Sequence, residues 1–244
     1  MSGARGGHFL ADRILETPVT WLFTAINLGV FAAAYFHEGR FKEGLEWETL
    51  QAYGACSRYH VWGGDYWRLL TAVFIHGGVL HLLMNSFFLF SWCSDLERTV
   101  GSAWFAFAYV TTGIAASAAS VIAHPVLSVG ASGAGFGIIG VTLSILYRRA
   151  GSWEAFMSSP GVRKVLGFTA IVLVVGFTML PHVLDNYAHL GGFVMGLPCG
   201  LILESRRGRR RPIWIAGVVA YMVVWIGLVV VACIPGFGFG RPGE

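Results

Sequence analysis

The sequence predicts an all-α polytopic membrane protein, and its composition is the first reason. Of its 244 residues, 55% are hydrophobic and 12% are charged, and the mean hydropathy is +0.64. A soluble globular domain carries about 25% charged residues. The second reason is a series of apolar segments, each close to the length of about 20 residues that a helix needs to cross the hydrocarbon layer. These segments are expected to be helical, because a helix satisfies its own backbone hydrogen bonds in lipid.

Seven transmembrane helices are predicted from these segments. They lie at roughly 18–36, 77–95, 103–123, 130–147, 163–180, 185–203 and 212–234. The chain is then divided into a tail (1–17), a six-helix domain (18–203), a basic linker (204–211), and a seventh helix with a short tail (212–244).

The basic residues predict the orientation. Arginine and lysine are concentrated in the segments before the first span and after the second, fourth and sixth; they are Arg5, Arg13, Arg98, Arg148, Arg149, Arg163, Lys164, Arg206, Arg207, Arg209, Arg210 and Arg211. If seven spans alternate in direction, all of these segments face one side, which the positive-inside rule makes the cytoplasm. We therefore expect a cytoplasmic N-terminal tail and linker and an external C-terminal tail. Nucleic acid is not expected as a partner, because the basic run at 206–211 directly follows a span.

The first span has two interpretations. Arg5 and Arg13 before an apolar run, with Ala32 to Ala34 near its end, resemble a secretory signal peptide and its cleavage site. However, the run is as long as a full span, and it contains Thr24 and Asn27, which suit a helix buried against protein. A retained first helix is favoured.

The first external loop, residues 37–76, is rich in aromatic side chains. They are Trp47, Tyr53, Tyr59, Trp62, Tyr66 and Trp67. Amphipathic aromatic rings favour the headgroup region, so this loop is expected to lie in the membrane interface.

Four polar residues are predicted to share one depth in the membrane. Ser132 lies among glycines at the start of the fourth span, His81 and Asn85 lie in the second, and His189 lies in the sixth. These spans all begin on the external side, and Ser132, His81 and His189 fall roughly 3–7 Å below its surface at about 1.5 Å rise per residue. Asn85 follows His81 by one turn on the same helix face.

Each of these residues also has a purely structural interpretation. A small residue such as Ser132 lets helices approach closely, and a histidine or asparagine can join neighbouring helices by hydrogen bonds. His76, at the turn before Gly77 and Gly78, is expected to be structural. Taken together, however, polar and ionisable groups are costly to bury in lipid and are functional candidates by default.

A stripe of small residues predicts how the sixth span packs. Ala188, Gly192, Gly196 and Gly200 recur every four residues, a spacing that allows close helix contact. If the fourth span is the partner, through Gly133 and Gly137, His189 reaches Ser132 and can act as its base. Asp185 either orients His189 or caps the sixth helix. Capping is favoured, because Asp at this position marks a helix start.

The same cavity contains groups that suit a developing oxyanion. Ser132 is predicted in the first turn of its helix, where backbone N–H groups lack intrahelical partners and the helix dipole favours negative charge. Asn85 and His81 add side-chain donors. A proton channel or transporter also uses buried histidines, but gives no reason for a serine among glycines at a helix start.

The chain resembles the rhomboid family of intramembrane serine proteases. Its matching motifs are Trp67-Arg68 in the first loop, His76 to Asn85 with His81 between them, Glu97-Arg98 with Gly101, Gly130-Ala131-Ser132-Gly133, and Ala188-His189 with Gly192 and Gly196. The resemblance covers about residues 18–203 and implies a six-helix rhomboid-like bundle to which the seventh helix is appended. One departure is Phe136, where many members carry a tyrosine that stacks on the catalytic histidine.

The resemblance implies a Ser132–His189 dyad without a required acid, and an oxyanion site made by His81, Asn85 and the Ser132 amide. It implies no metal and no cofactor, and substrates that are single-pass membrane proteins cut in or near their transmembrane segment. The alternative is a catalytically inactive rhomboid-like protein that binds membrane clients. A bacterial inner membrane is the expected location. The sequence does not indicate an oligomeric state.

Overall fold

The computed structural model describes residues 14–39, 44–124, 126–180, 183–205 and 211–235. Across these ranges the regular secondary structure is helical, and β-pairing is limited to two isolated bridges. Within the described residues, six helical segments are long and apolar enough to cross a membrane: Pro18–Glu38 (α2), Val79–Val100, Ser102–Ala123 (α8), Pro160–Thr178 (α11), Asn186–Leu203 and Trp214–Cys233. The last two are parts of α12 (Asn186–Ser205) and α13 (Arg211–Cys233). The predicted all-α polytopic fold is confirmed.

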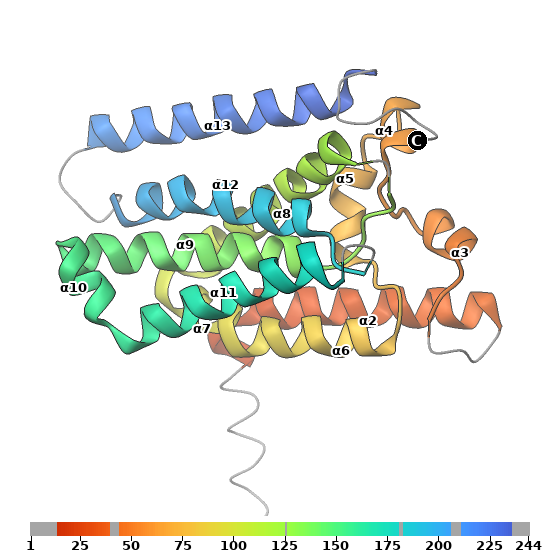
Figure 1. Cartoon of the computed structure of the whole chain (residues 1–244), viewed down its shortest axis with the longest axis horizontal. Helices are drawn as coiled ribbons and strands as arrows, with labels where there is room; N and C mark the ends of the chain where they lie inside the picture. Colours follow the sequence, from red (N-terminus) through yellow and green to blue (C-terminus); the bar gives the residue numbers. More distant parts are fainter. Residues whose placement is uncertain (1–13, 40–43, 125, 181–182, 206–210, 236–244) are drawn as a thin grey trace, which may run out of the picture.

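The predicted fourth span is a helix, α9 (Ser132–Ala150), but it is not among these six. It is rich in glycine and carries Arg148 and Arg149 in its last turn, and both features lower its hydropathy. Most of its length is buried by the neighbouring helices rather than left for lipid. Figure 1 shows α9 running between α12 and α11, alongside the longer helices. A helix enclosed by protein does not need the apolar outer surface that a hydropathy criterion detects.

The second span continues past its predicted end at residue 95. It consists of α6 (Val79–Phe88), a π-helical turn at Leu89–Cys93, and α7 (Ser94–Val100). A prediction from hydropathy alone places the end of the span where the charged residues begin. The structure continues because the carboxylate of buried Glu97 accepts hydrogen bonds from the backbone N–H groups of Val19 and Thr20, at 2.9 and 2.8 Å. Glu97 therefore caps the start of α2.

The first loop contains short helices that the sequence did not predict. They are α3 (Trp47–Ala52), α4 (Arg58–Trp62), α5 (Arg68–Thr71) and a 3-10 turn at Ala72–Phe74. Figure 1 shows them gathered at one end of the long helices. Arg68 organises this loop, because its guanidinium donates to the carbonyl groups of Gln51 and Ala55 at 2.6 and 3.1 Å.

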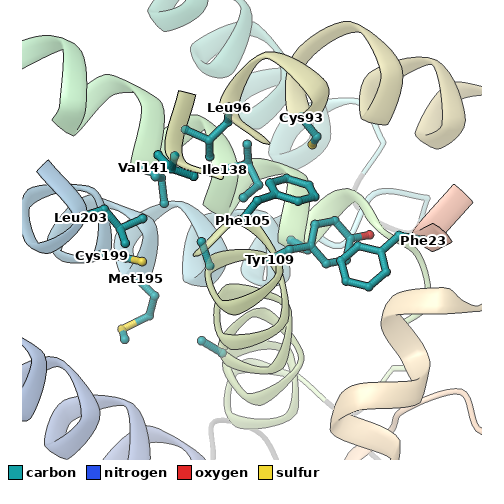
Figure 2. Packing of buried hydrophobic residues seen from close by; sticks show 14 of the residues in the cluster. Phe23, Cys93, Leu96, Phe105, Tyr109, Ile138, Val141, Met195, Cys199 and Leu203 are labelled. Carbon is teal, nitrogen blue, oxygen red and sulfur yellow. The ribbon is translucent and has the colours of Figure 1, made fainter. Parts of the chain in front are cut away.

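The core of the bundle surrounds α8. Figure 2 shows Phe105 and Tyr109 of this helix between Phe23 of α2 and Ile138 of α9. Phe105 and Tyr109 are fully buried. The first helix is therefore part of the packed bundle, and its Thr24 and Asn27 are buried as well.

The seventh helix, α13, packs along α8. The Tyr221 hydroxyl donates to Thr111 Oγ1 at 3.0 Å, and the Trp225 indole donates to the Thr111 carbonyl at 2.8 Å. A short helix, α10 (Trp153–Ser158), joins α9 to α11. Residues 1–13 of the predicted N-terminal tail, most of the basic linker (206–210) and the C-terminal tail (236–244) lie outside the described residues.

Candidate active site

The two residues that the sequence pairs as nucleophile and base lie in contact. Ser132 is the first residue of α9, and His189 lies in the first turn of α12. The distance between Ser132 Oγ and His189 Nε2 is 2.9 Å. His189 is 3% exposed, so this hydrogen bond lies within the bundle and not at its surface.

The helices that carry this pair meet through glycines. A Cβ atom at Gly192 would overlap the carbonyl oxygen of Gly133, and one at Gly196 would overlap that of Gly137. Gly192 and Gly196 therefore lie directly against the backbone of α9. Small residues permit this approach in membrane helices, and the approach brings the start of α12 to Ser132.

His189 is stacked against an aromatic ring, and the nearby carboxyl group of Asp185 is bonded to other residues. The Phe136 ring lies on the imidazole, with 4.3 Å between centroids and 9° between planes. Asp185 does not hold the imidazole: its Oδ1 accepts from the Ala188 amide at 3.0 Å, and its Oδ2 accepts from Ser120 Oγ at 2.6 Å. Asp185 thus caps α12 and ties it to α8. Within the described part of the chain, His189 Nδ1 has no hydrogen-bond partner. The arrangement is a pair rather than a triad.

His81 and Asn85 lie beside the segment that leads into Ser132. Gly130 has a φ of +118°, and a Cβ there would come within 2.7 Å of the His81 ring and 3.8 Å of Asn85 Nδ2. Only glycine suits both the left-handed backbone and this close contact. Asn85 Nδ2 donates one hydrogen bond to the His81 carbonyl at 3.0 Å, and an amide has a second N–H to offer. The predicted donors are therefore brought to the same side of α9 as Ser132.

The segment before Ser132 is held by the first loop. Cys56 and Ser128 exchange two backbone hydrogen bonds, at 3.1 and 2.7 Å, and the Gly130 amide donates to the Ala72 carbonyl at 2.9 Å. A small cavity adjoins Ser132, lined by Ser117, Ser128 and Asp185 among others, with space for about one water molecule. The first loop thus fixes the position of Ser128 and Gly130, which lead directly into α9.

The family can now be stated from comparison with known proteins. The model of the rhomboid domain matches residues 63–206, a range that contains Ser132, His189, His81 and Asn85. The chain belongs to the rhomboid family.

Named relatives agree with this assignment. The chain is 33% identical over 177 residues to Rhomboid protease GluP of Bacillus subtilis (strain 168), covering 72% of this chain and 33% of GluP. It is 37% identical over 164 residues to RHOMBOID-like protein 4 of Arabidopsis thaliana, covering 65% of this chain and 39% of that relative. It is 32% identical over 149 residues to Putative rhomboid protease YdcA of Bacillus subtilis (strain 168), covering 60% of this chain and 72% of YdcA. The chain therefore spans less than half the length of the first two relatives.

Four predicted motif residues of this rhomboid fold, Trp67, Arg68, Glu97 and Arg98, make their contacts outside the Ser132–His189 pair. Arg68 organises the first loop and lies over the ring of Trp67, 4.6 Å from its centroid. Glu97 caps α2, and Arg98 pairs with Glu16 and Asp95 at 3.1 and 2.8 Å. These side chains support the bundle and the loop rather than the Ser132–His189 pair.

His76 lies behind the oxyanion candidates. It is fully buried, and its ring centroid is 5.2 Å from that of His81 in an edge-to-face contact. Burial, together with the nearby His81, lowers the pKa of His76 to about 3. His76 is therefore neutral at physiological pH, which suits the structural role that the sequence indicates.

Sequence reasoning missed three residues around the site. Ser120 holds Asp185, Thr112 packs against Gly137, and the Asn186 side chain donates to the Leu173 carbonyl of α11 at 2.9 Å. Each contact joins residues far apart in the chain, and no local pattern marks it. Within the described ranges, no group of three His, Cys, Asp or Glu side chains could hold a metal ion.

Proposed function

We propose that this rhomboid-family protein is an intramembrane serine endopeptidase that cuts single-pass membrane proteins in or near their transmembrane segment. The observation that carries the proposal is the 2.9 Å contact between Ser132 Oγ and His189 Nε2. A hydroxyl becomes a nucleophile when an adjacent base accepts its proton. The burial of His189, which is 3% exposed, argues against an incidental surface contact.

The proposed reaction has two steps. Ser132 Oγ attacks the scissile carbonyl carbon while His189 Nε2 takes the hydroxyl proton. His189 then returns that proton to the leaving amine, and the C–N bond breaks to give an acyl-enzyme. In the second step His189 takes a proton from water, whose oxygen attacks the ester, and the proton returns to Ser132 Oγ.

The oxyanion of each tetrahedral intermediate requires donors that are already oriented. The Ser132 amide lies at the start of α9, where N–H groups have no intrahelical partner. The Asn85 amide and the His81 ring supply two more donors, both beside Gly130. Removing one donor from such a site typically lowers kcat by about 10²- to 10³-fold.

The substrate's helical backbone sets a further requirement. Its scissile carbonyl is hydrogen-bonded within the helix, so the substrate must unwind locally before attack. Segments rich in glycine or other weak helix formers are therefore favoured. We infer that α11 moves to admit the substrate, because only Val162, Thr169 and Gly176 along this helix are buried.

The proposed location is a bacterial inner membrane, with the N-terminus in the cytoplasm and the Ser132 end facing outward. The distribution of arginine and lysine supports this orientation. Cysteines placed singly at loop positions and labelled from one side of intact cells test it. Labelling of a first-loop cysteine only after the cells are permeabilised would contradict it.

The function is tested with a fluorophosphonate probe and a single-pass substrate in proteoliposomes. The wild-type protein is expected to be labelled and to cleave, and both Ser132→Ala and His189→Ala to lose both activities. Ser144→Ala is the matched control, because Ser144 is another serine of α9, buried and about three turns away from Ser132. Wild-type protein that binds the substrate but is neither labelled nor active would favour the inactive client-binding alternative. Activity that survives in Ser132→Ala would contradict the assignment of the nucleophile.

A further inference from the structure

A cavity of about 280 Å³ lies between the second span, α9 and α11, toward the end of the bundle away from Ser132. Ser132 begins α9, and Arg149, in the last turn of the same helix, lines the cavity. At about 1.5 Å rise per residue, these two residues are roughly 25 Å apart along the helix axis. The cavity is therefore separate from the candidate active site, and the proposed reaction gives it no role.

The length of this cavity matches one leaflet of a bilayer. Ile138 and Arg149 both line it and lie eleven residues apart on α9, a separation of roughly 16 Å along a helix. Half of a hydrocarbon layer about 30 Å thick is roughly 15 Å. The lining is mostly apolar over this length, and it includes Trp92, Leu96, Ile138, Ile145, Leu146 and Val165. The cavity therefore has the length and the surface that suit a single acyl chain.

Two cationic side chains lie at the polar end of the cavity. Arg149 forms part of its lining and is exposed. Lys164 of α11 is exposed as well, and it precedes Phe168 by one helical turn, so the two residues share a face of α11. The Phe168 ring packs against Trp92 of the second span, with 5.5 Å between centroids. Lys164 therefore lies on the face of α11 that borders the cavity.

The carboxylate at this end of the cavity is already engaged. Asp95 also lines the cavity, but its Oδ1 accepts a hydrogen bond from Arg98 at 2.8 Å, and Arg98 pairs with Glu16 at 3.1 Å as well. Arg148 and Arg163 are exposed and add two further positive charges beside Arg149 and Lys164 in the sequence. The distribution of arginine and lysine predicts that this end faces the cytoplasm. Basic pockets between transmembrane helices on that side bind anionic lipid headgroups.

We propose that this cavity binds an anionic phospholipid, with one acyl chain between the second span, α9 and α11 and with the phosphate beside Arg149 and Lys164. A guanidinium donates two parallel hydrogen bonds to a phosphate, and an ammonium group attracts it as a point charge. The apolar lining below these cations removes the acyl chain from contact with other lipids. The site requires only that the chain spans a membrane, so it is independent of the proposed protease function.

The experiment measures lipid binding to the full chain, purified in detergent and freed of native lipid. The protein is titrated with phosphatidylglycerol or phosphatidylcholine carrying the same acyl chains, and bound lipid is counted by native mass spectrometry. Wild type is expected to bind one phosphatidylglycerol about fivefold to thirtyfold more tightly than phosphatidylcholine, the range for one to two cations at about fivefold each. Excess glycerol phosphate, which has the anionic group but no acyl chain, is expected not to displace the bound lipid.

Variants separate the headgroup from the acyl chain. Arg149→Gln and Lys164→Gln are each expected to weaken phosphatidylglycerol binding by about fivefold, and the double variant is expected to bind the two lipids equally. Thr142→Phe adds a ring inside the cavity, which Thr142 lines. It is expected to weaken both lipids by at least about fivefold, because the ring takes apolar volume that the acyl chain needs. Arg148→Gln is the matched control: it removes an exposed charge from the same turn of α9, but Arg148 does not line the cavity.

Three results would overturn the proposal. The first is a double variant that keeps the wild-type preference for phosphatidylglycerol while Arg148→Gln also keeps it. The second is displacement of the lipid by glycerol phosphate, which would mark a site for soluble phosphate. The third is displacement of the lipid by a single-pass substrate bound to Ser132→Ala, which would assign the cavity to the substrate. The thermal unfolding midpoint in lipid-free detergent shows whether Thr142→Phe is folded, and the two glutamine variants decide the question if it is not.

Discussion

The ring of Phe136 lies parallel to the imidazole of His189, 4.3 Å from it between centroids. Phe136 is one helical turn after Ser132, so α9 supplies both the candidate nucleophile and the surface on which the candidate base rests. Because His189 Nδ1 has no hydrogen-bond partner among the described residues, we propose that the stacked Phe136 ring orients the imidazole, the role that an acid has in a triad. The tyrosine hydroxyl found in many rhomboid proteins is not needed for this contact.

The first prediction concerns this stacked pair. Phe136→Leu keeps an apolar side chain but removes the aromatic face, and it is expected to lower kcat/KM about threefold to tenfold, the range of a typical aromatic pair. Phe136→Tyr is expected to retain at least wild-type activity, because the ring is unchanged. Both are measured as cleavage of a single-pass substrate in detergent. Equal activity in the leucine variant and wild type would show that stacking does not position His189.

The second prediction concerns the oxyanion donors. Asn85→Ala is expected to lower kcat by about 10²-fold with little change in KM, because the donor acts on charge that develops only after substrate is bound. Met84→Ala is the matched control, since Met84 is the preceding residue of α6 and is 64% exposed. A rise in KM at constant kcat would contradict the proposed role and assign Asn85 to substrate binding.

The third prediction concerns the contact between α9 and α12. Gly192→Ala places a methyl group against the Gly133 carbonyl, and overpacking of this kind is expected to cost about 1–3 kcal/mol of stability. Gly227→Ala in α13 is the control, because nothing lies within 4 Å of its Cβ position. The measurement is the thermal unfolding midpoint in detergent. Equal midpoints for the two variants would mean that α9 and α12 are not in close contact.

Much of the fold followed from local sequence. The helices begin and end within a few residues of the predicted spans, apart from the end of the second, because apolar length is a property of each segment alone. The contact between Ser132 and His189 was also predictable. The two helices that carry these residues have small residues at the same four-residue spacing, Gly133 and Gly137 on one and Gly192 and Gly196 on the other. The helix α9 was predicted as well, although it is not among the six segments that are long and apolar enough to cross a membrane, because the neighbouring helices bury most of it.

The remaining features depend on contacts between distant residues. The helices of the first loop form around Arg68, which binds carbonyl groups up to 17 residues away. The continuation of the second span depends on Glu97 meeting the start of α2, 77 residues earlier. The start of α12 is held by a hydrogen bond that Asp185 accepts from Ser120 of α8, 65 residues earlier. No window of sequence contains both members of these pairs.

The fourth prediction concerns pH and His76. Burial and the nearby His81 lower its pKa in the folded protein to about 3 from its ordinary value of 6.5, so between these pH values the unfolded chain binds a proton that the folded protein does not. Its contribution to stability is full above about pH 6.5 and is lost as pH falls toward 3, at about 1.4 kcal/mol per pH unit. The thermal unfolding midpoint in detergent is therefore expected to fall between pH 6.5 and 4.5. His76→Phe is expected to fall less steeply, and a parallel decline in both proteins would exclude His76 as a cause.

The fifth prediction concerns the movement of α11. The rings of Trp92, in the second span, and Phe168, in α11, lie 5.5 Å apart between centroids, so cysteines at both positions are within reach of a short reducible thiol linker. Cross-linking is expected to lower cleavage of a membrane substrate by about tenfold or more, because opening must precede chemistry at a gated site. Fluorophosphonate labelling is expected to be unchanged, since Ser132 and His189 belong to α9 and α12. Reduction of the linker should restore cleavage, and each single-cysteine variant treated with the linker controls for reaction at the native cysteines. Full cleavage by the cross-linked protein would mean that substrates reach Ser132 without separation of α11 from the second span.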